Sequence, residues 1–228
     1  IIKIMIKEKL NYGSFFFKLY IYYQLLIKEK YYINRNSYSQ SAEDLFITKF
    51  FKNKKKGFYI DLGAFHPIRH NNTQKLYNLG WNGINIDLNP ASIDFFNIVR
   101  KRDINIFAAI APTKTKKKVY FDGFFSTTNT LNKKHHKKYN SSVNDKNYFF
   151  IKTKIFDEII NRPFDFLNID IEGMDKNVLF TINLKKYSPK LVCIEILNKK
   201  TFNEISKYFK KNKYKFLNKL GVSYFFSR

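Results

Sequence analysis

The chain has 228 residues, of which 42 are basic and 18 acidic, so its formal net charge is +24 at pH 7. A hydrophobic share of 44% is enough for the core of one domain, and a single cysteine, Cys193, excludes a disulfide framework within the chain. The basic residues are spread along the sequence rather than gathered into one arm. We therefore expect no sequence-specific nucleic-acid partner, and only a non-specific attraction to anions such as lipid headgroups, nucleic acid or phosphorylated glycans.

Residues 1–37 form a predicted helical extension to a domain over residues 38–228. The run Phe15 to Ile27 is apolar and aromatic, but its 13 residues fall short of the roughly 20 needed to span a bilayer. It also lacks the small-residue cleavage site of a secretory signal. We expect an amphipathic helix that packs on the domain of a cytoplasmic protein. The alternative is a helix that lies on an anionic membrane surface, which would make the protein peripheral to the membrane.

The domain alternates strand-like and helix-like segments. Short apolar runs predict strands at 57–62, 83–88, 104–110, 164–170 and 190–196. Helices are expected at about 41–51 with Ser41 as N-cap, from Asn71 or Asn72 to Gly80, from Pro90, and at 155–161, 175–183 and 200–211. The least regular segment, 111–150, is predicted to hold a hairpin and a basic loop, and the chain ends in two strands around a turn. This order is typical of the α/β, Rossmann-like class I methyltransferase fold, a mostly parallel seven-stranded sheet with a C-terminal antiparallel hairpin.

Four of the predicted strands end in a carboxylate, at Asp61, Asp87, Asp170 and Glu195. In an open α/β sheet, ligands bind outside the carboxyl ends of the strands. Because acidic residues are scarce in this chain, their position along one edge indicates a ligand site. The alternative is that these acids only cap the helices that follow.

The turn after the first strand contains Gly63 but no G-x-G-x-x-G motif. A lone glycine lets the backbone approach a ligand, but it builds no pyrophosphate cradle, which argues against NAD and FAD. S-adenosylmethionine (SAM) carries no phosphate and needs no cradle. Asp87 ends the second strand, where a carboxylate accepts hydrogen bonds from ribose hydroxyls. That contact serves any adenosine ligand and does not by itself select SAM.

Asp170 and Glu172 lie two residues apart, so an extended backbone would place both carboxylates on one face. They are candidates for a general base, for divalent-metal ligands or for substrate anchors, and the use of a metal stays open. The alternative is that Glu172 only caps the next helix. His66 is a second candidate base because it follows the turn glycine. His135 and His136 lie among four lysines, where we expect a solvated basic loop rather than a metal site.

A series of motifs stands in order along the chain. They are Ser39-Gln40-Ser41-Ala42-Glu43-Asp44, Phe58-Tyr59-Ile60-Asp61-Leu62-Gly63-Ala64, His66-Pro67, Asn72-Thr73, Leu76-Tyr77 through Asp87-Leu88-Asn89-Pro90, Arg102-Asp103-Ile104-Asn105 and Ile169-Asp170-Ile171-Glu172-Gly173. Together they resemble the FkbM family of methyltransferases over about residues 38–197. Ala42, Asn71 and Asn89 depart from the family pattern, which leaves the choice of substrate open more than the fold.

The resemblance implies a SAM-dependent O-methyltransferase that acts on a hydroxyl of a sugar, a glycan or a related small metabolite, as in surface-glycan biosynthesis. It implies contacts from Asp61, Gly63 and Ala64 to the methionine part of SAM, and from Asp87 to the ribose. Gln40, Glu43, Asn72 and Thr73 match the motifs that frame the pocket. Asp170 and Glu172 match the family's acidic element on the acceptor side.

We predict an in-line methyl transfer to an alcohol oxygen, with Asp170 as the first choice of base and His66 or Glu172 in support. Two other classes compete with this prediction. A nucleic-acid methyltransferase would carry an Asn-Pro-Pro-Tyr-type base pocket after the fourth strand, and this chain has Asp170-Ile-Glu-Gly there. A non-catalytic protein with a SAM fold would have little reason to keep four acids at the sheet edge.

Overall fold

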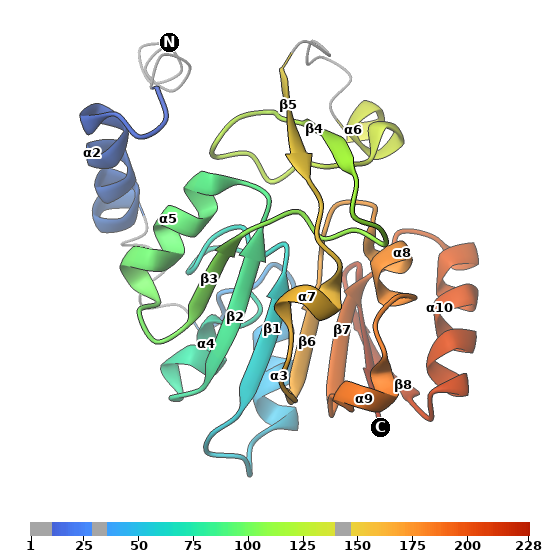
Figure 1. The fold of residues 1–228 in the computed structure, drawn as a ribbon. Coiled ribbons are helices and arrows are strands. Elements are labelled where there is room, and N and C mark those ends of the chain that lie inside the picture. Colours follow the sequence, from blue (N-terminus) through green and yellow to red (C-terminus); the bar gives the residue numbers. More distant parts are fainter. Residues whose placement is uncertain (1–10, 29–35, 140–146) are drawn as a thin grey trace.

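The computed structural model describes residues 11–28, 36–139 and 147–228. Its centre is a seven-stranded sheet in the order β3-β2-β1-β6-β7-β9-β8 (Figure 1). The strands are β1 (Phe58–Leu62), β2 (Asn82–Asp87), β3 (Ile104–Phe107), β6 (Phe166–Ile169), β7 (Leu191–Glu195), β8 (Lys215–Leu220) and β9 (Ser223–Ser227). The first five of these pair in parallel, and β9 runs antiparallel to both β7 and β8. The predicted sheet with its closing hairpin is therefore confirmed.

Helices cover both faces of this sheet because alternate strand residues point to opposite sides. Tyr59 and Phe166 belong to one buried cluster together with Ile47 of α3, whereas Ile60 and Leu167 belong to another that includes much of α10. The helices of the domain are α3 (Glu43–Phe50), α4 (Gln74–Asn78), α5 (Pro90–Val99), α7 (Phe156–Ile159), α8 (Asp175–Leu179), α9 (Leu184–Tyr187) and α10 (Lys199–Lys211). As predicted, Pro90 opens α5 in its first turn, with Asn89 as the N-cap.

Several element boundaries differ from the sequence prediction. The N-cap of α3 is Ala42, in the left-handed region at φ 63°, and Ser41 instead donates its backbone N–H to Glu43 Oε2 at 2.6 Å. Helix α4 starts only at Gln74, because Thr73 is held in a buried hydrogen-bond network. The helix predicted at 175–183 ends at Leu179 as α8, and Asn183 instead caps a separate short helix, α9, which lies beyond the predicted range. The third strand ends at Phe107, and Ile110 forms an isolated bridge with Lys154.

The N-terminal helix α2 (Phe15–Tyr23) continues as a π-helix, η1 (Gln24–Lys28). Its buried residues Phe17, Ile21 and Leu25 pack against Ala91 and Phe95 of α5. The prediction of a helix that packs on the domain is confirmed, but the helix is not amphipathic as predicted, because its exposed side is apolar as well. Residues 1–10 and 29–35 of the predicted extension lie outside the described residues. Across the described ranges, every helix falls short of the length and apolarity that crossing a bilayer requires.

A small cap lies above the carboxyl ends of the parallel strands (Figure 1). It consists of the antiparallel pair β4 (Lys116–Tyr120) and β5 (Tyr148–Lys152), with α6 (Lys133–Tyr139) between them in the chain. The predicted hairpin is confirmed as a strand pair, although its connection includes α6 and the undescribed residues 140–146.

The prediction of a solvated basic loop around His135 and His136 is wrong. These residues lie in α6, and both histidines are buried while the four lysines of the helix are exposed. The His136 ring stacks on Tyr120 of β4, and His135 Nε2 lies 2.7 Å from Glu172 Oε2. This segment is therefore an amphipathic helix, with its two histidines facing the protein and its four lysines facing the solvent.

Candidate functional site

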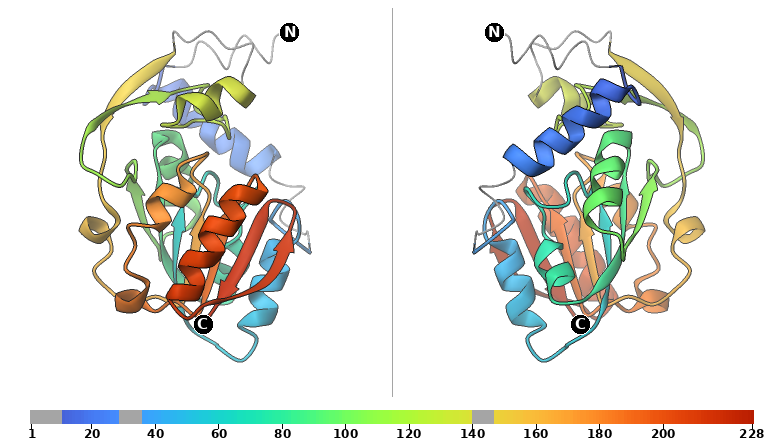
Figure 2. Two further views of the ribbon diagram at one scale, coloured as in Figure 1. Left: turned by 90° about the vertical axis from the view of Figure 1, so that its right-hand side faces the viewer. Right: turned by 90° about the vertical axis from the view of Figure 1, so that its left-hand side faces the viewer.

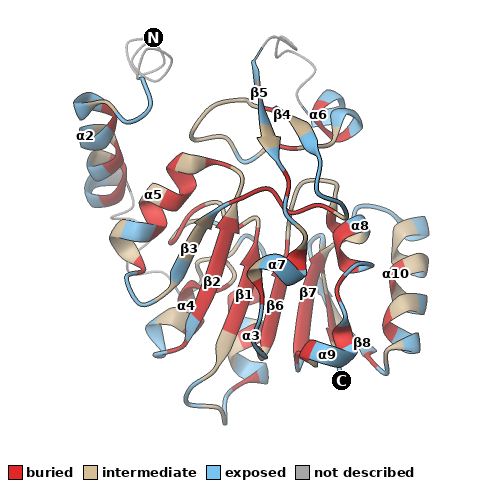
Figure 3. Cartoon of the chain, in the orientation of Figure 1, coloured by how far each residue is buried: buried red, intermediate tan, exposed pale blue. Residues whose placement is uncertain are grey.

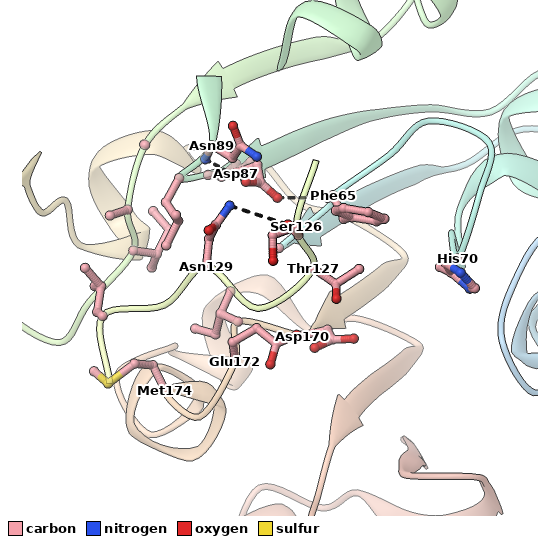
Figure 4. A pocket seen from close by; sticks show the side chains of 18 of the residues that line it. Phe65, His70, Asp87, Asn89, Ser126, Thr127, Asn129, Asp170, Glu172 and Met174 are labelled. Atoms are coloured by element: carbon pink, nitrogen blue, oxygen red, sulfur yellow. Dashed lines mark hydrogen bonds between the residues drawn. The ribbon is translucent and has the colours of Figure 1, made fainter. Parts of the chain in front are cut away.

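A pocket lies between the carboxyl ends of the strands and the cap (Figure 4). The sheet contributes Asp87 at the end of β2 and Asp170 just after β6, and the cap contributes a loop at Ser126 and Thr127. Its lining also includes Gln40, Gly63, Phe65, His70, Ile86, Leu88, Asn89, Ala108, Ala109, Ile110, Asn129, Leu131, Ile171, Glu172 and Met174. The expected ligand edge of the sheet therefore holds a pocket. Two of the four strand-end acids, Asp87 and Asp170, line it, whereas Asp61 and Glu195 do not.

Asp87 is fixed at the pocket wall by two backbone donors. Its Oδ2 accepts the Phe65 N–H at 2.8 Å, and its Oδ1 accepts the Asn89 N–H at 2.7 Å (Figure 4). Burial raises the pKa of Asp87 to about 6, an effect that these two hydrogen bonds oppose. Above that pH the residue is a carboxylate in a fixed orientation, with lone pairs left for donors in the pocket.

Asp61, by contrast, does not line the pocket. It is buried in β1, where its Oδ1 accepts from Asn168 Nδ2 at 2.8 Å and its Oδ2 accepts from Thr73 Oγ1 at 2.8 Å. These contacts occupy the carboxylate with other side chains of the protein. The expected contact of Asp61 with a cofactor is therefore not supported, and the same holds for Thr73 and the buried Ala64.

Arg100 organises the polar core next to Asp61. Its side chain is fully buried, and it donates to Pro67 O, to Asn71 Oδ1 at 2.6 Å, to Thr73 Oγ1 at 2.8 Å and to Tyr59 Oη at 3.0 Å. Tyr59 in turn donates to Asp103. The sequence analysis overlooked Arg100, since arginine is almost never fully buried unless it is paired. The one available signal was Asp103, three residues further on, which was part of the family motif.

Position 63 requires glycine because two loops of the protein contact each other there. Its φ is 76°, and a Cβ at this position would lie 1.6 Å from the carbonyl oxygen of Asp170. No side chain fits there, so the turn after β1 and the segment after β6 touch through bare backbone. Gly63 also lines the pocket, as expected, but the close approach that its size permits is to the protein itself.

Three carboxylates converge next to the pocket, and one of them, Asp170, lines it. Asp170, Asp175 at the start of α8 and Glu195 at the end of β7 each place one oxygen within 4.8 Å of the others, which makes them a possible cation-binding group among the described residues. Asp175 accepts the N–H groups of Ile171 and Gly173, whereas Glu195 Oε2 is buried without a hydrogen bond.

These three carboxylates, the acidic group hereafter, share raised pKa values. Burial and then the nearby Asp175 raise the pKa of Glu195 to about 8, and burial raises that of Asp175 to about 6. The pKa of Asp170 is raised well above its ordinary value, by burial first and then by Glu195. Such a group can hold a shared proton or bind a divalent cation, because either one relieves the repulsion between close carboxylates.

Glu172 lines the pocket in an unexpected conformation. Its φ of 53° is left-handed, so the prediction that an extended backbone places Asp170 and Glu172 on one face is wrong. The cap determines this turn: Thr130 Oγ1 donates to the Glu172 carbonyl at 2.7 Å, and Asn132 donates to the Gly173 carbonyl at 2.8 Å. The carboxylate meets His135 rather than the N-terminus of α8, so Glu172 is not the helix cap of the alternative reading.

His66 lies away from the pocket lining, in the turn after β1. It is 2% exposed, and its Nδ1 accepts hydrogen bonds from the backbone N–H groups of Ile68 and Arg69. Its ring packs on the Phe95 ring, with the two ring centroids 4.8 Å apart. Burial lowers its pKa well below the ordinary value. The ring is therefore held as a neutral structural acceptor, which does not support its assignment as a base.

Of the three remaining residues that were predicted to frame the pocket, one lines it and two form hydrogen bonds elsewhere in the protein. Gln40 lines the pocket, whereas Glu43 accepts from Ser223 Oγ at 3.1 Å and Asn72 donates to Asn168 Oδ1 at 3.0 Å. The sequence analysis missed the cap residues Ser126 and Thr127. Their only signal was their position in the irregular 111–150 segment, because hydroxyl residues in loops are too common to single out.

Comparisons with known proteins agree with this architecture. The sequence model of the methyltransferase FkbM domain matches residues 61–216, which is more than half of the chain. No curated protein matches. Among solved structures, methyltransferase FkbM from Methylobacillus flagellatus KT has a TM-score of 0.51 and 14% identity, and the match covers 76% of this chain and 44% of that chain. At this identity the likeness shows the fold alone, and the chain spans less than half the length of that protein.

Proposed function

The chain belongs to the FkbM methyltransferase family, and on that premise we propose that it is a SAM-dependent O-methyltransferase that acts on a hydroxyl of a sugar, a glycan or a related small metabolite. The observation that carries the proposal is the fixed Asp87 carboxylate in the wall of a pocket at the carboxyl edge of the sheet. A carboxylate at the end of this strand is suited to accept both ribose hydroxyls of an adenosine ligand. The turn after β1 offers no G-x-G-x-x-G cradle, which favours a ligand without pyrophosphate.

The pocket wall next to Asp87 suits an adenine ring. Leu88, just after β2, and Ala108 and Ala109, just after β3, give it an apolar lining. On the other side, Ser126 and Thr127 offer hydroxyl groups that suit an acceptor rich in hydroxyls. We propose that SAM lies between Asp87 and Asp170, with its methyl group toward Asp170 and the cap.

Asp170 is the proposed general base. The methyl group of SAM is already activated, so the protein must mainly align oxygen, carbon and sulfur, an effect worth on the order of 7–11 kcal/mol. The acceptor hydroxyl must lose its proton, which Asp170 Oδ would take as the new carbon–oxygen bond forms; the carbon–sulfur bond of SAM would break in the same step and release S-adenosylhomocysteine. In its deprotonated form Asp170 is a stronger base than an ordinary carboxylate because its pKa is raised, and general-base catalysis typically contributes about 10²–10⁴-fold.

A divalent cation is the alternative way to activate the hydroxyl. Asp170, Asp175 and Glu195 would hold it, because their oxygens converge and one of them, Glu195 Oε2, has no hydrogen bond. Such a cation would lower the pKa of the hydroxyl. Turnover that is abolished by EDTA and restored by Mg²⁺ would favour the cation, and turnover that is indifferent to EDTA would favour Asp170 as a base.

The test of the cofactor is calorimetric titration of the folded protein with SAM, S-adenosylhomocysteine and NAD. We expect the first two to bind and NAD to bind poorly. Folded protein that binds neither SAM nor S-adenosylhomocysteine would refute the proposal. A screen of nucleotide sugars and lipid-linked glycans with labelled SAM would then identify the acceptor.

A nucleic-acid acceptor is the second candidate, favoured only by the net charge of +24. We expect any binding to nucleic acid to weaken steeply with salt, because neutralising phosphates releases counterions. Filter binding to several sequences at low and high salt tests this, and tight, sequence-selective binding at high salt would favour the nucleic-acid class.

A further inference from the structure

Helix α2 and the π-helix η1 are apolar on both sides, although only one side packs on the protein. Phe17, Ile21 and Leu25 are buried against α5. The opposite side, the outer face of α2 hereafter, is exposed: Phe15 is 70% exposed and Leu26 71%. The other members of this face are Phe16, Leu19, Tyr22 and Ile27. Figure 3 shows the helix divided lengthwise between buried and exposed residues.

The spacing of the exposed residues makes them one continuous stripe. Phe15, Leu19, Tyr22 and Leu26 follow each other at intervals of three and four residues, which is the repeat of one helix face. Lys18 is the only charged residue between Phe15 and Ile27. A surface helix normally turns polar residues to water, so a large apolar stripe in this position marks an interaction surface.

The charge around this face indicates the chemistry of its partner. Helix α6 exposes four lysines, Lys133, Lys134, Lys137 and Lys138. Figures 1 and 2 show α2 and α6 at the same end of the molecule, where the cap covers the carboxyl edge of the sheet. With a net charge of +24 for the chain, a second copy would bring like charge to this end, whereas an anionic surface would neutralise it.

We propose that the outer face of α2 docks the protein on an anionic lipid bilayer. The helix is too short to span the membrane and would lie in its plane, with phenylalanine, leucine and tyrosine at the boundary between headgroups and acyl chains. Aromatic side chains favour this boundary because they are large, apolar and, in tyrosine, polar at one end. The lysines of α6 would contact the anionic headgroups. This orientation turns the pocket end of the molecule toward the membrane.

The test is co-sedimentation of the full chain with vesicles that contain phosphatidylglycerol, compared with vesicles of phosphatidylcholine alone. We expect binding to the anionic vesicles that weakens with added salt. The double variant Phe15→Ser/Leu26→Ser should lower vesicle affinity at least about tenfold. The matched control is Leu79→Ser, which removes an apolar side chain that is 59% exposed just after α4, away from the cap, and should bind as the unmodified chain does.

Thermal unfolding and SAM titration of the double variant would show that fold and pocket remain intact. Undiminished vesicle binding in that variant would overturn the proposal. It would also be overturned if sedimentation velocity showed a dimer that dissociates in the double variant, since the outer face would then serve a second copy. A separate variant, Lys134→Glu/Lys137→Glu, should weaken binding to anionic vesicles while leaving the apolar stripe unchanged.

Discussion

The polar core around Arg100 and the acidic group at the pocket edge are both made of buried, ionisable side chains, but they differ in how completely their hydrogen bonds are formed. Each guanidinium nitrogen of Arg100 donates to an acceptor, and Asp103 and Tyr59 complete the network. In the acidic group, carboxylates face carboxylates, and Glu195 Oε2 has no hydrogen bond. The Arg100 network holds loops in place. The acidic group brings like charges close together, and a proton, a cation or a substrate hydroxyl can reduce the repulsion between them.

The comparison separates two carboxylates that look alike in the sequence. Asp61 and Asp170 each end an apolar strand, and both lie at the same edge of the sheet. Asp61 is held by Asn168 and Thr73, and so belongs to the structural side. Asp170 lies close to Glu195 and lines the pocket, so it belongs to the acidic group to which the proposed chemistry is assigned. Substitutions in the two clusters should therefore affect different measurements.

The largest expected effect comes from Arg100→Met. Removing the buried cation leaves Asn71, Thr73 and Tyr59 without a shared partner, and we expect a loss of about 3–5 kcal/mol in the free energy of unfolding. Urea denaturation measures this loss. The control is Arg102→Met, an exposed arginine two residues away that donates to Tyr77 O, which should cost less than about 1 kcal/mol. Equal costs for the two variants would contradict the structural role of the Arg100 network.

The next effect is catalytic. Asp170→Asn keeps the shape of the side chain and removes its charge, so turnover should fall by about 10²-fold or more, with SAM affinity little changed. Steady-state kinetics with the identified acceptor would measure it. Asp165→Asn, at the other end of β6 and paired with Lys54, is the control and should retain turnover. If the Asp170 variant turns over normally while His66→Ala is inactive, His66 is the base despite its burial.

A smaller effect is expected on cofactor binding. Asp87→Ala should weaken SAM by about 1–3 kcal/mol, because hydrogen bonds to a charged group are lost. Since the pKa of Asp87 is raised to about 6, SAM affinity of the unmodified chain should also decrease as the pH falls through 6 and the carboxylate is protonated. Calorimetry at several pH values measures both. The control is Asp157→Ala, at an exposed position, which should leave SAM affinity unchanged. If Asp87→Ala also leaves SAM affinity unchanged, Asp87 does not contact the ribose.

The smallest effect is on the pH dependence of stability. The pKa of Glu195 is about 8 in the folded protein against an ordinary 4.5, so between these values the folded state holds the extra proton. The free energy of unfolding should therefore decrease as the pH rises from 4.5 to 8. Glu195→Gln removes the contribution of Glu195 and leaves those of Asp170 and Asp175, and it should be more stable than the unmodified chain at pH 8 and above, by about 1–2 kcal/mol after allowance for partial exposure.

The control for this prediction is Glu204→Gln, a partly exposed glutamate paired with Lys176 at 2.5 Å. It should leave the decrease in stability between pH 4.5 and 8 unchanged, because its carboxylate is solvated. If Glu195→Gln destabilises the protein and Mg²⁺ raises the melting temperature of the unmodified chain only, the acidic group is a cation site.

The order of elements was predictable because it depends on local pattern. Apolar runs of strand length, separated by helical segments, indicated the parallel sheet, and the final pair of strands indicated the antiparallel hairpin. The position of the ligand edge followed from the same order, since parallel strands present their carboxyl ends together. Asp87 and Asp170 were identified as pocket residues on that ground, and both line it.

The roles of individual polar residues were less predictable because they depend on partners far apart in the chain. Asp61 was predicted to contact the cofactor, but its carboxylate accepts a hydrogen bond from Asn168, 107 positions away in the sequence, and so has a structural role. His135 and His136 are buried because Glu172 and Tyr120 meet them from other elements. A sequence pattern predicts which residues of a single helix or strand are exposed. The contacts described above form only when elements that are distant in the sequence pack together.

The sequence by itself thus determined the family, the sheet and the edge at which the pocket lies, because periodicity, turn glycines and strand-end acids act within a few residues. Only the tertiary structure decided which acids remain available for chemistry and which are held in the core. It also decided that α6 turns histidines inward and that α2 leaves an apolar face outside. The reason is that hydrogen bonds, pKa shifts and burial are properties of neighbours in space, which the chain brings together only by folding.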